Sequence, residues 1–204
     1  MLHRCDVKVF QSYRPVRRKE SVIRQLDLPS TGVRTRAEFD TLPTVPRGWA
    51  WELRSGRLEL SLMPVTFWYS RIVFQVLDFW REHGYEIAGD QYVADSGFAR
   101  GEIGRHNFVA DGVVFQPGHR PDKHSTVHAP AHLFAVVEAV WQPDQVREAI
   151  DKLRVYSMLG IPHFWIVRGD HDSDDLDGFV SMYELVGEEY KLTGSRLVSE
   201  LSPN

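Results

Sequence analysis

Three carboxylates and one lysine lie within or beside apolar stretches of the sequence. Glu138 is the single charged residue of "AVVEAVW", Glu52 lies in "WAWELR", and Asp111 lies in "FVADGVVF". Lys152 falls at the border of the apolar stripe of a predicted helix. A buried carboxylate either has a raised pKa or needs a cation to keep it ionised. Two or three carboxylates with bound waters are typical of a Mg²⁺ site for phosphate chemistry, where a lysine can orient the attacking water.

Each of these residues also has an ordinary structural interpretation. A half-exposed strand glutamate such as Glu52 is common, and the Asp111–Gly112 pair is typical of a hairpin turn. Against such a turn, the two apolar runs would have to pair back on each other without polar flanking residues. Glu138 could be satisfied by an arginine, and Lys152 could extend its amine to solvent. Only the combination of the four residues favours a metal site.

The elements that would position these residues follow from hydrophobic periodicity and turn signals. Apolar residues recur every three or four places over residues 65–83 and predict a long buried helix that Gly84 ends. Pro143 and Asp144 begin a second helix, and Gly160 ends it. A short helical piece is predicted at "TRAEFDTLP". Two hairpins are predicted, one about Ser55–Gly56 and a last one at "GDHDSDDLDG". Further strands are predicted near residues 85–94 and 105–116, around Glu138 and after Pro162. This order mixes hairpins with one crossover helix, so we expect an α/β fold with a mixed β-sheet flanked by helices.

Length, composition and charge limit the class of protein. The chain has 204 residues, 43% of them hydrophobic, which is enough to bury one core, and we expect a single domain over residues 36–204. Residues 1–35 are interpreted as a peripheral basic arm, either disordered or in contact with a nucleic-acid strand. Nine lysines and arginines stand against three acidic residues from Met1 to Arg36. No apolar run reaches the roughly 18 residues that span a membrane, so a soluble, cytoplasmic protein is expected.

Other candidate sites have weaker patterns. The single cysteine, Cys5, excludes a disulfide framework and a cysteine-based zinc site. His128 and His132 have helical spacing, but Pro130 between them disfavours a regular helix and therefore a zinc site. The acidic turn that starts at Asp170 lacks the glycine and the final glutamate of a calcium loop, so we interpret it as a solvated hairpin tip.

Four motifs in order resemble one known family. The segments are "WELRSGRLEL", "VADGVVFQPG", "HLFAVVEAV" and "KLRVYSMLGIPHFWIV". They are similar to the "ELxxG", "PDxxxV", "LxxEV" and "K...Y...G[VI]PxYW[IV]V" patterns of the Uma-two family, a branch of the PD-(D/E)XK nuclease superfamily. The resemblance covers about residues 36 to 193. It implies a restriction-endonuclease-like core and a metal-dependent endonuclease that acts on DNA.

The resemblance also assigns roles to the four residues. It implies that Asp111 and Glu138 bind Mg²⁺ or Mn²⁺, that Glu52 is an additional acidic residue of the metal site, and that Lys152 is the catalytic lysine. That lysine has moved onto the helix, because Val140 occupies the usual strand position two residues after the glutamate. DNA is then the expected partner, and a homodimer is expected for a small nuclease that cuts two strands.

Departures from the family pattern support an alternative hypothesis. Ala110 replaces a proline, Trp141 a serine, His163 an acidic residue and Arg168 an aspartate. Under the alternative, the chain is a catalytically silent nuclease-fold module for nucleic-acid or protein binding, with Glu138 paired to a side chain such as Arg168. A metal-dependent hydrolase of another phosphoester is a third hypothesis.

Overall fold

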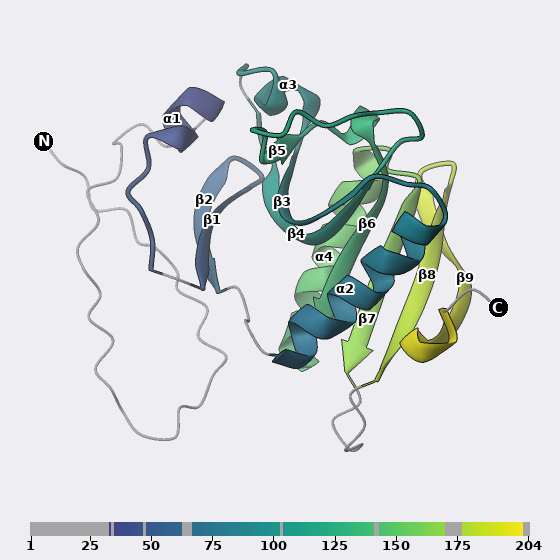
Figure 1. Cartoon of the computed structure of the whole chain (residues 1–204). Helices are drawn as coiled ribbons and strands as arrows, with labels where there is room; N and C mark the ends of the chain where they lie inside the picture. Colours follow the sequence, from purple (N-terminus) through teal and green to yellow (C-terminus); the bar gives the residue numbers. More distant parts are fainter. Residues whose placement is uncertain are drawn as a thin grey trace, which may run out of the picture.

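The structure of the chain is a computed structural model, shown in Figure 1. It describes residues 33, 35–46, 48–62, 67–102, 104–140, 143–169 and 177–201. In chain order the elements are α1 (Arg36–Asp40), β1 (Trp49–Arg54), β2 (Arg57–Leu62), α2 (Phe67–Glu82), β3 (Ile87–Ala94), α3 (Ser96–Ala99), β4 (Asn107–Phe115), β5 (Val127–His128), η1 (Pro130–His132), β6 (Leu133–Val140), α4 (Pro143–Met158), β7 (His163–Gly169), β8 (Gly178–Val186), β9 (Glu189–Leu197) and η2 (Val198–Leu201).

Two predicted segments lie largely beyond this description. The basic arm, residues 1–35, is outside the described residues except for Val33 and Thr35. The acidic turn is outside them over residues 170–176. The domain boundary at residue 36 and the solvated hairpin tip therefore stay predictions.

The strands form one mixed sheet. Its order is β2-β1-β4-β6-β7-β8-β9, and β3 pairs with β4 and with β5. β6 and β7 run parallel because α4 crosses over between them, and β3 runs parallel to the short β5. The remaining pairs are antiparallel. The predicted α/β fold, a mixed sheet flanked by helices, is confirmed.

The ends of the elements follow the local sequence. Ser55 and Gly56 connect β1 to β2 with positive φ angles of 50° and 77°, and glycine adopts such angles without steric cost. Gly84, with φ 87°, follows α2 and Gly160, with φ 74°, follows α4, as expected for residues that end helices. The hairpin and both long helices therefore lie where the sequence predicts them.

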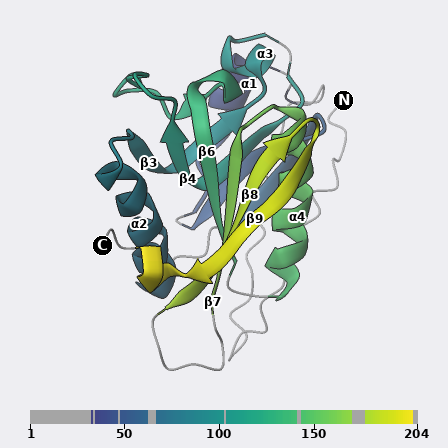
Figure 2. The same cartoon turned by 90° about the vertical axis from the view of Figure 1, so that its right-hand side faces the viewer.

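The two long helices cover opposite faces of the sheet, as Figure 2 shows. Val137 of β6 belongs to the core cluster under α2, whereas Val136 and Val140 belong to the cluster under α4. Side chains alternate along a strand, so Glu138 lies on the α4 face with Val136 and Val140. This alternation directs Glu138 toward the helix that carries Lys152. No helix within the described ranges is long and apolar enough to span a membrane.

One edge of β4 is shared by two strands. β1 pairs with this edge at Leu53 and Asn107, and β6 pairs with it from Gly112 to Phe115. Between these points, residues 108–111 have no ladder partner in β1 or β6 within the described chain. We call residues 108–111, where β1 and β6 diverge, the fork. Buried backbone groups need hydrogen-bond partners, so side chains must supply them in the fork.

Candidate active site

Lys152 lies at the centre of the fork. Its Nζ donates to the carbonyl oxygen of Val109 at 2.8 Å and to Oε2 of Glu138 at 2.9 Å. The same nitrogen is 3.7 Å from Oε1 of Glu52. One ammonium group therefore joins β1, β4 and β6 to α4. The predicted residues Glu52, Glu138 and Lys152, distant in sequence, meet at this point.

All four predicted site residues are buried. The exposed fractions are 1% for Glu52, 8% for Asp111, 5% for Glu138 and 6% for Lys152. The ordinary interpretations of a half-exposed strand glutamate and of a lysine that extends to solvent are therefore wrong. Four buried ionisable groups in one region need a specific arrangement of partners, because an unpaired buried charge is costly.

The Glu52 carboxylate is fully engaged by protein groups. Oε1 accepts from the amide of Val109 at 3.0 Å. Oε2 accepts from Oγ of Ser61 at 2.7 Å and from Nη2 of Arg54 at 2.9 Å. These bonds take the place of a β1–β4 ladder pair at Val109. They also leave Glu52 less suited than the other two carboxylates to bind a metal ion directly.

Arg54 connects the β1–β2 hairpin to α4. Its Nη2 also donates to Oε1 of Glu148 at 2.5 Å, and its Nε lies 3.2 Å from Oε2 of Glu59. The guanidinium carbon is 5.2 Å from the ring centroid of Phe108. The planar guanidinium thus holds three carboxylates and an aromatic face at once. This contact fixes Glu52 relative to the helix that carries Lys152.

Glu138 accepts hydrogen bonds from two residues of α4. Lys152 contacts Oε2, and the hydroxyl of Tyr156 donates to Oε1 at 2.8 Å. Lys152 and Tyr156 are one helical turn apart, so they face the same strand. The suggested partner Arg168 is wrong, because Arg168 is exposed at the end of β7 and Glu138 is paired with Lys152.

Asp111 lies beside Glu138 on the neighbouring strand. The last β4–β6 pair toward the fork is Gly112 with Val137, so Asp111 and Glu138 occupy the next facing positions. Oδ2 of Asp111 accepts from the amide of Ala139 at 2.7 Å, and the Tyr69 hydroxyl of α2 interacts with the carboxylate and lowers its pKa. The interpretation of Asp111 as a hairpin turn is wrong, because β4 continues through it.

The three carboxyl groups differ in acidity. Burial raises the pKa of Glu52, but the charges of Lys152 and Arg54 and the Ser61 hydrogen bond outweigh burial, and the net pKa lies below its ordinary value. Burial raises the pKa of Glu138 to about 8 and that of Asp111 to about 6, and the Lys152 charge only partly opposes it. Asp111 and Glu138 are therefore the two groups that the protein does not fully stabilise as anions.

The pKa shifts of Lys152 and Glu138 favour different protonation states of the pair. Burial lowers the pKa of Lys152, but the Glu138 and Glu52 charges outweigh it and raise the pKa above its ordinary value, which favours the ammonium. The raised pKa of Glu138 favours a neutral acid instead. The 2.9 Å contact between Nζ and Oε2 and the donation from Tyr156 favour the ion pair. Glu138 is then a carboxylate held by one cation and close to taking up a proton.

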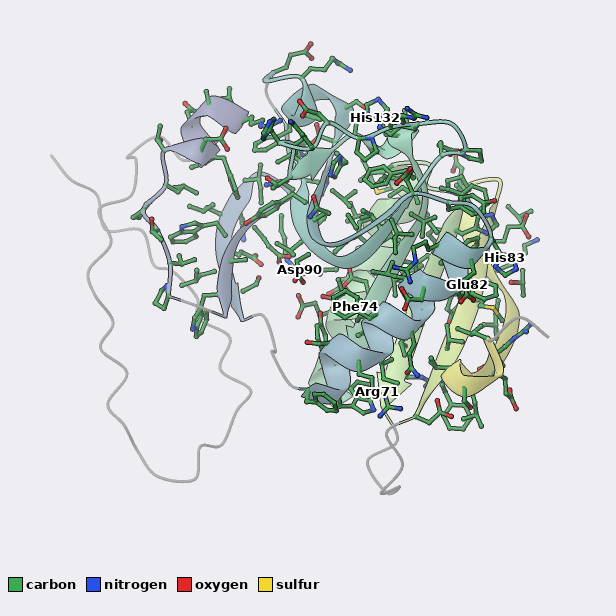
Figure 3. All side chains as sticks on the ribbon, in the orientation of Figure 1. Arg71, Phe74, Glu82, His83, Asp90 and His132 are labelled. Carbon is green, nitrogen blue, oxygen red and sulfur yellow. The ribbon has the colours of Figure 1, made fainter. Side chains whose placement is uncertain are left out.

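The described residues contain no group of three or more histidine, cysteine, aspartate or glutamate side chains that could hold a metal ion. Asp111 and Glu138 are thus a pair rather than part of a complete cage. The stacked histidines His119 and His132, with ring centroids 4.3 Å apart, lie before the start of β6, whereas Glu138 is near its end. Figure 3 shows His132 at the far end of the molecule from Arg71 in α2.

Sequence reasoning missed several residues that hold the site. Tyr156 and Tyr69 contact Glu138 and Asp111, and Arg54 and Ser61 contact Glu52. Tyr156 had one available signal, its position one turn after Lys152 on the same side of α4. Arg54 is two residues after Glu52 on β1 and Ser61 lies on the paired strand β2, so the hairpin itself was the available signal for both. Tyr69 carries no local signal, because α2 meets Asp111 only in the folded protein.

Comparisons with known proteins agree with this architecture. A family model described as "Putative restriction endonuclease", Uma2, matches residues 36–203. No curated protein matches the chain. The crystal structure of "a putative nuclease belonging to DUF820" from Anabaena variabilis is similar, with a TM-score of 0.56 and 17% identity over 78% of this chain and 83% of that chain. At this identity the likeness shows a shared fold. Because the family model spans most of the sequence, the chain belongs to the Uma2 family, as its motifs indicate.

Proposed function

We propose that the chain is a Mg²⁺-dependent endonuclease that hydrolyses phosphodiester bonds of DNA, with Mn²⁺ as an alternative metal ion. The family description supports a nuclease. The observation that carries the proposal is the position of Lys152, whose Nζ lies 2.9 Å from Glu138 and 3.7 Å from Glu52 in the fork beside Asp111. A buried lysine among buried carboxylates suits phosphodiester hydrolysis with a metal ion, because the carboxylates can hold the ion and the lysine can orient the attacking water.

The donor set fits Mg²⁺. This ion prefers oxygen ligands and usually keeps several waters while one or two carboxylates hold it. Asp111 and Glu138 supply two carboxylates at facing positions, and both have raised pKa values because of burial. A divalent cation would relieve that cost. When bound, it would lower the pKa of a bound water and polarise the phosphate.

The protein groups have distinct roles in this proposal. Lys152 orients the attacking water or stabilises the negative charge that develops on the phosphate. Glu52 keeps Lys152 charged and in place, directly or through a water, and its engaged oxygens make it the weakest of the three predicted metal ligands. Tyr156 orients Glu138, and Tyr69 orients Asp111.

A second candidate function is the catalytically silent module. One observation favours it: Lys152 and Tyr156 satisfy both oxygens of Glu138 without a metal ion. A silent module would neither bind Mg²⁺ nor gain stability from it. The expected homodimer, the DNA partner and the cytoplasmic location remain predictions under either function.

Thermal unfolding with and without Mg²⁺ or Mn²⁺, followed by cleavage assays on plasmid and single-stranded DNA, separates the two functions. The wild type should gain stability with millimolar metal by mass action, and Glu138→Gln should not. Glu102→Gln is a matched control, because Glu102 is exposed and pairs with Arg100 away from the fork. Its response to metal should equal that of the wild type. Metal-dependent cleavage that survives in Glu138→Gln would refute the assigned site, and a wild type without metal response would favour the silent module.

A further inference from the structure

The β3–β4 pair changes faces partway along its length. Val113 and Phe108 of β4 both belong to the core cluster on the α4 face, although residues five apart in a regular strand point to opposite faces. β3 shows the same change, because Ala88 packs against that cluster and Val93 belongs to it. Each strand therefore contains one interruption of the alternation.

The interruption falls at Asp90 and Asp111. The register pairs Gly89 with Gly112 and Gln91 with Ala110, but lacks a pair between these two described aspartates. Asp90 has a φ of +51°, in the left-handed region that residues other than glycine, asparagine and aspartate rarely adopt. Irregularities of this kind in a strand pair redirect side chains, and they occur frequently beside active sites.

The change of face explains the unusual contacts of Asp111. Its carboxylate accepts from the amide of Ala139 in the neighbouring strand and also reaches Tyr69 of α2. A side chain that stood perpendicular to a regular strand could not take the place of a backbone carbonyl in this way. Asp90 lies on β3, which α2 packs against.

We propose that Asp90 is a positioning residue, whose left-handed backbone turns the β3–β4 pair and so places the Asp111 carboxylate between β4 and β6. The effect on metal binding and cleavage rests on the function proposed above, whereas the effect on the position of Asp111 does not. The aspartate carboxylate is not required for this role. The requirement is a residue that tolerates a positive φ.

Four substitutions at position 90 separate the effect of the backbone conformation from that of the carboxylate. Asp90→Gly and Asp90→Asn remove the carboxylate but retain a residue that adopts a positive φ readily. Asp90→Val removes it and introduces a β-branched residue that resists this conformation. Asp90→Ala also removes the carboxylate and disfavours a positive φ, but with less steric conflict than valine. It replaces Asp90→Val in the experiment if the valine variant does not fold.

Amide hydrogen exchange by NMR reads the position of Asp111 without any need for activity. The Ala139 amide, which donates to Asp111, should exchange at least about tenfold faster in Asp90→Val than in the wild type. The Val109 amide, which donates to Glu52, should keep its protection and report that the fold is intact. Asp90→Gly and Asp90→Asn should keep both amides protected. Ser55→Val is a matched control, because Ser55 is the other described non-glycine residue with positive φ, and Ala139 should stay protected there.

Stabilisation by Mn²⁺ and DNA cleavage should follow the same order, present in Asp90→Gly and Asp90→Asn and lost in Asp90→Val. The proposal is overturned if Ala139 stays protected in Asp90→Val. It is equally overturned if the glycine and asparagine variants lose the Ala139 protection as the valine variant does, because the carboxylate would then be the active element. If the wild type neither binds metal nor cleaves DNA, the proposed function fails, and the exchange rates still decide the role of Asp90.

Discussion

The surroundings of Glu52 and of Glu138 differ although both glutamates are buried beside one lysine. Around Glu52 on β1, an arginine, a serine and a backbone amide supply hydrogen bonds, and its pKa is lowered despite burial. Around Glu138 on β6, Lys152 and Tyr156 are the donors within the described part of the chain, Asp111 adds a like charge, and burial raises the pKa to about 8.

This difference indicates that the carboxylates on the two strands that flank the fork have different roles. We call Glu52 and its partners the β1 side, and Glu138 with Asp111 the β6 side. The hydrogen bonds of the β1 side are complete without any ligand, so it serves to hold Lys152 in its charged form. The β6 side has two carboxylates that the protein stabilises incompletely, and an additional cation would complete it. The contrast between a carboxylate with a lowered pKa and carboxylates with raised pKa values therefore points to a metal site more clearly than burial alone.

Removing the cation that the two sides share should have the largest effect. Lys152→Met leaves Glu138 and Glu52 buried without their common partner and is expected to reduce the free energy of unfolding by about 3–5 kcal/mol. Denaturant titration measures this loss. A cost below about 1 kcal/mol would show that the carboxylates take up protons or other partners. It would contradict the assignment of Lys152 as the cation that Glu52 and Glu138 share.

Neutralising the β6 side should abolish activity with little effect on folding. Glu138→Gln retains an acceptor for Lys152 and removes an incompletely stabilised charge. We expect DNA cleavage to fall by about 100-fold or more, while the metal-free free energy of unfolding changes by less than about 1 kcal/mol. Plasmid nicking rates and urea titration at neutral pH check both parts. A large loss of stability would mean that Glu138 is a structural ion-pair partner.

Neutralising the β1 side should have the opposite pattern of effects, a loss of stability with metal binding retained. Glu52→Gln removes the charge that Arg54 and Lys152 contact, and it should reduce the free energy of unfolding by about 2 kcal/mol, the range for hydrogen bonds to charged groups. The gain of stability with Mn²⁺ should persist. A loss of the Mn²⁺ response with unchanged metal-free stability would make Glu52 a direct ligand, as the sequence resemblance implies.

The pH dependence of metal binding should sharpen the contrast further. Burial raises the pKa of Asp111 to about 6 and that of Glu138 to about 8, so the folded metal-free protein binds protons there more tightly than the unfolded chain. Metal-free stability should therefore fall as pH rises through these values. Mn²⁺ affinity should rise by up to about tenfold per pH unit between pH 6 and 8, because the ion displaces the Glu138 proton there. Calorimetric titration measures the affinity, and a flat profile from pH 6 to 8 would contradict the assignment.

The sequence was sufficient for the elements whose signals are local. The turn at Ser55–Gly56, the periodicity of α2 and the proline at the start of α4 depend on neighbouring residues and predict these elements correctly. The four site residues could be found in the sequence because charged residues in apolar elements stand out there. The structure places all four in or beside the fork. Asp111 was ambiguous, since an Asp-Gly pair predicts a turn, and only the pairing of the residues on either side of it with β3 and β6 continues β4 past this point.

The partners of the site could not be predicted, because they are set by tertiary packing. Arg168 was a reasonable partner for Glu138 by charge, but it lies opposite Val140 and points to solvent. Tyr156 reads as a core residue of α4, and only the crossing of α4 over β6 directs its hydroxyl to Glu138. The fork itself depends on where β1 leaves β4, which no local signal specifies.

The assembly of the site from β1, β4, β6 and α4 has a consequence for synthesis of the chain. Glu52 leaves the ribosome well before Lys152, and contacts between residues so distant in sequence form late in folding. A nascent chain that stops before α4 contains the carboxylates but not their cation. The complete set of groups therefore arises only when α4 has been synthesised and has docked on the sheet.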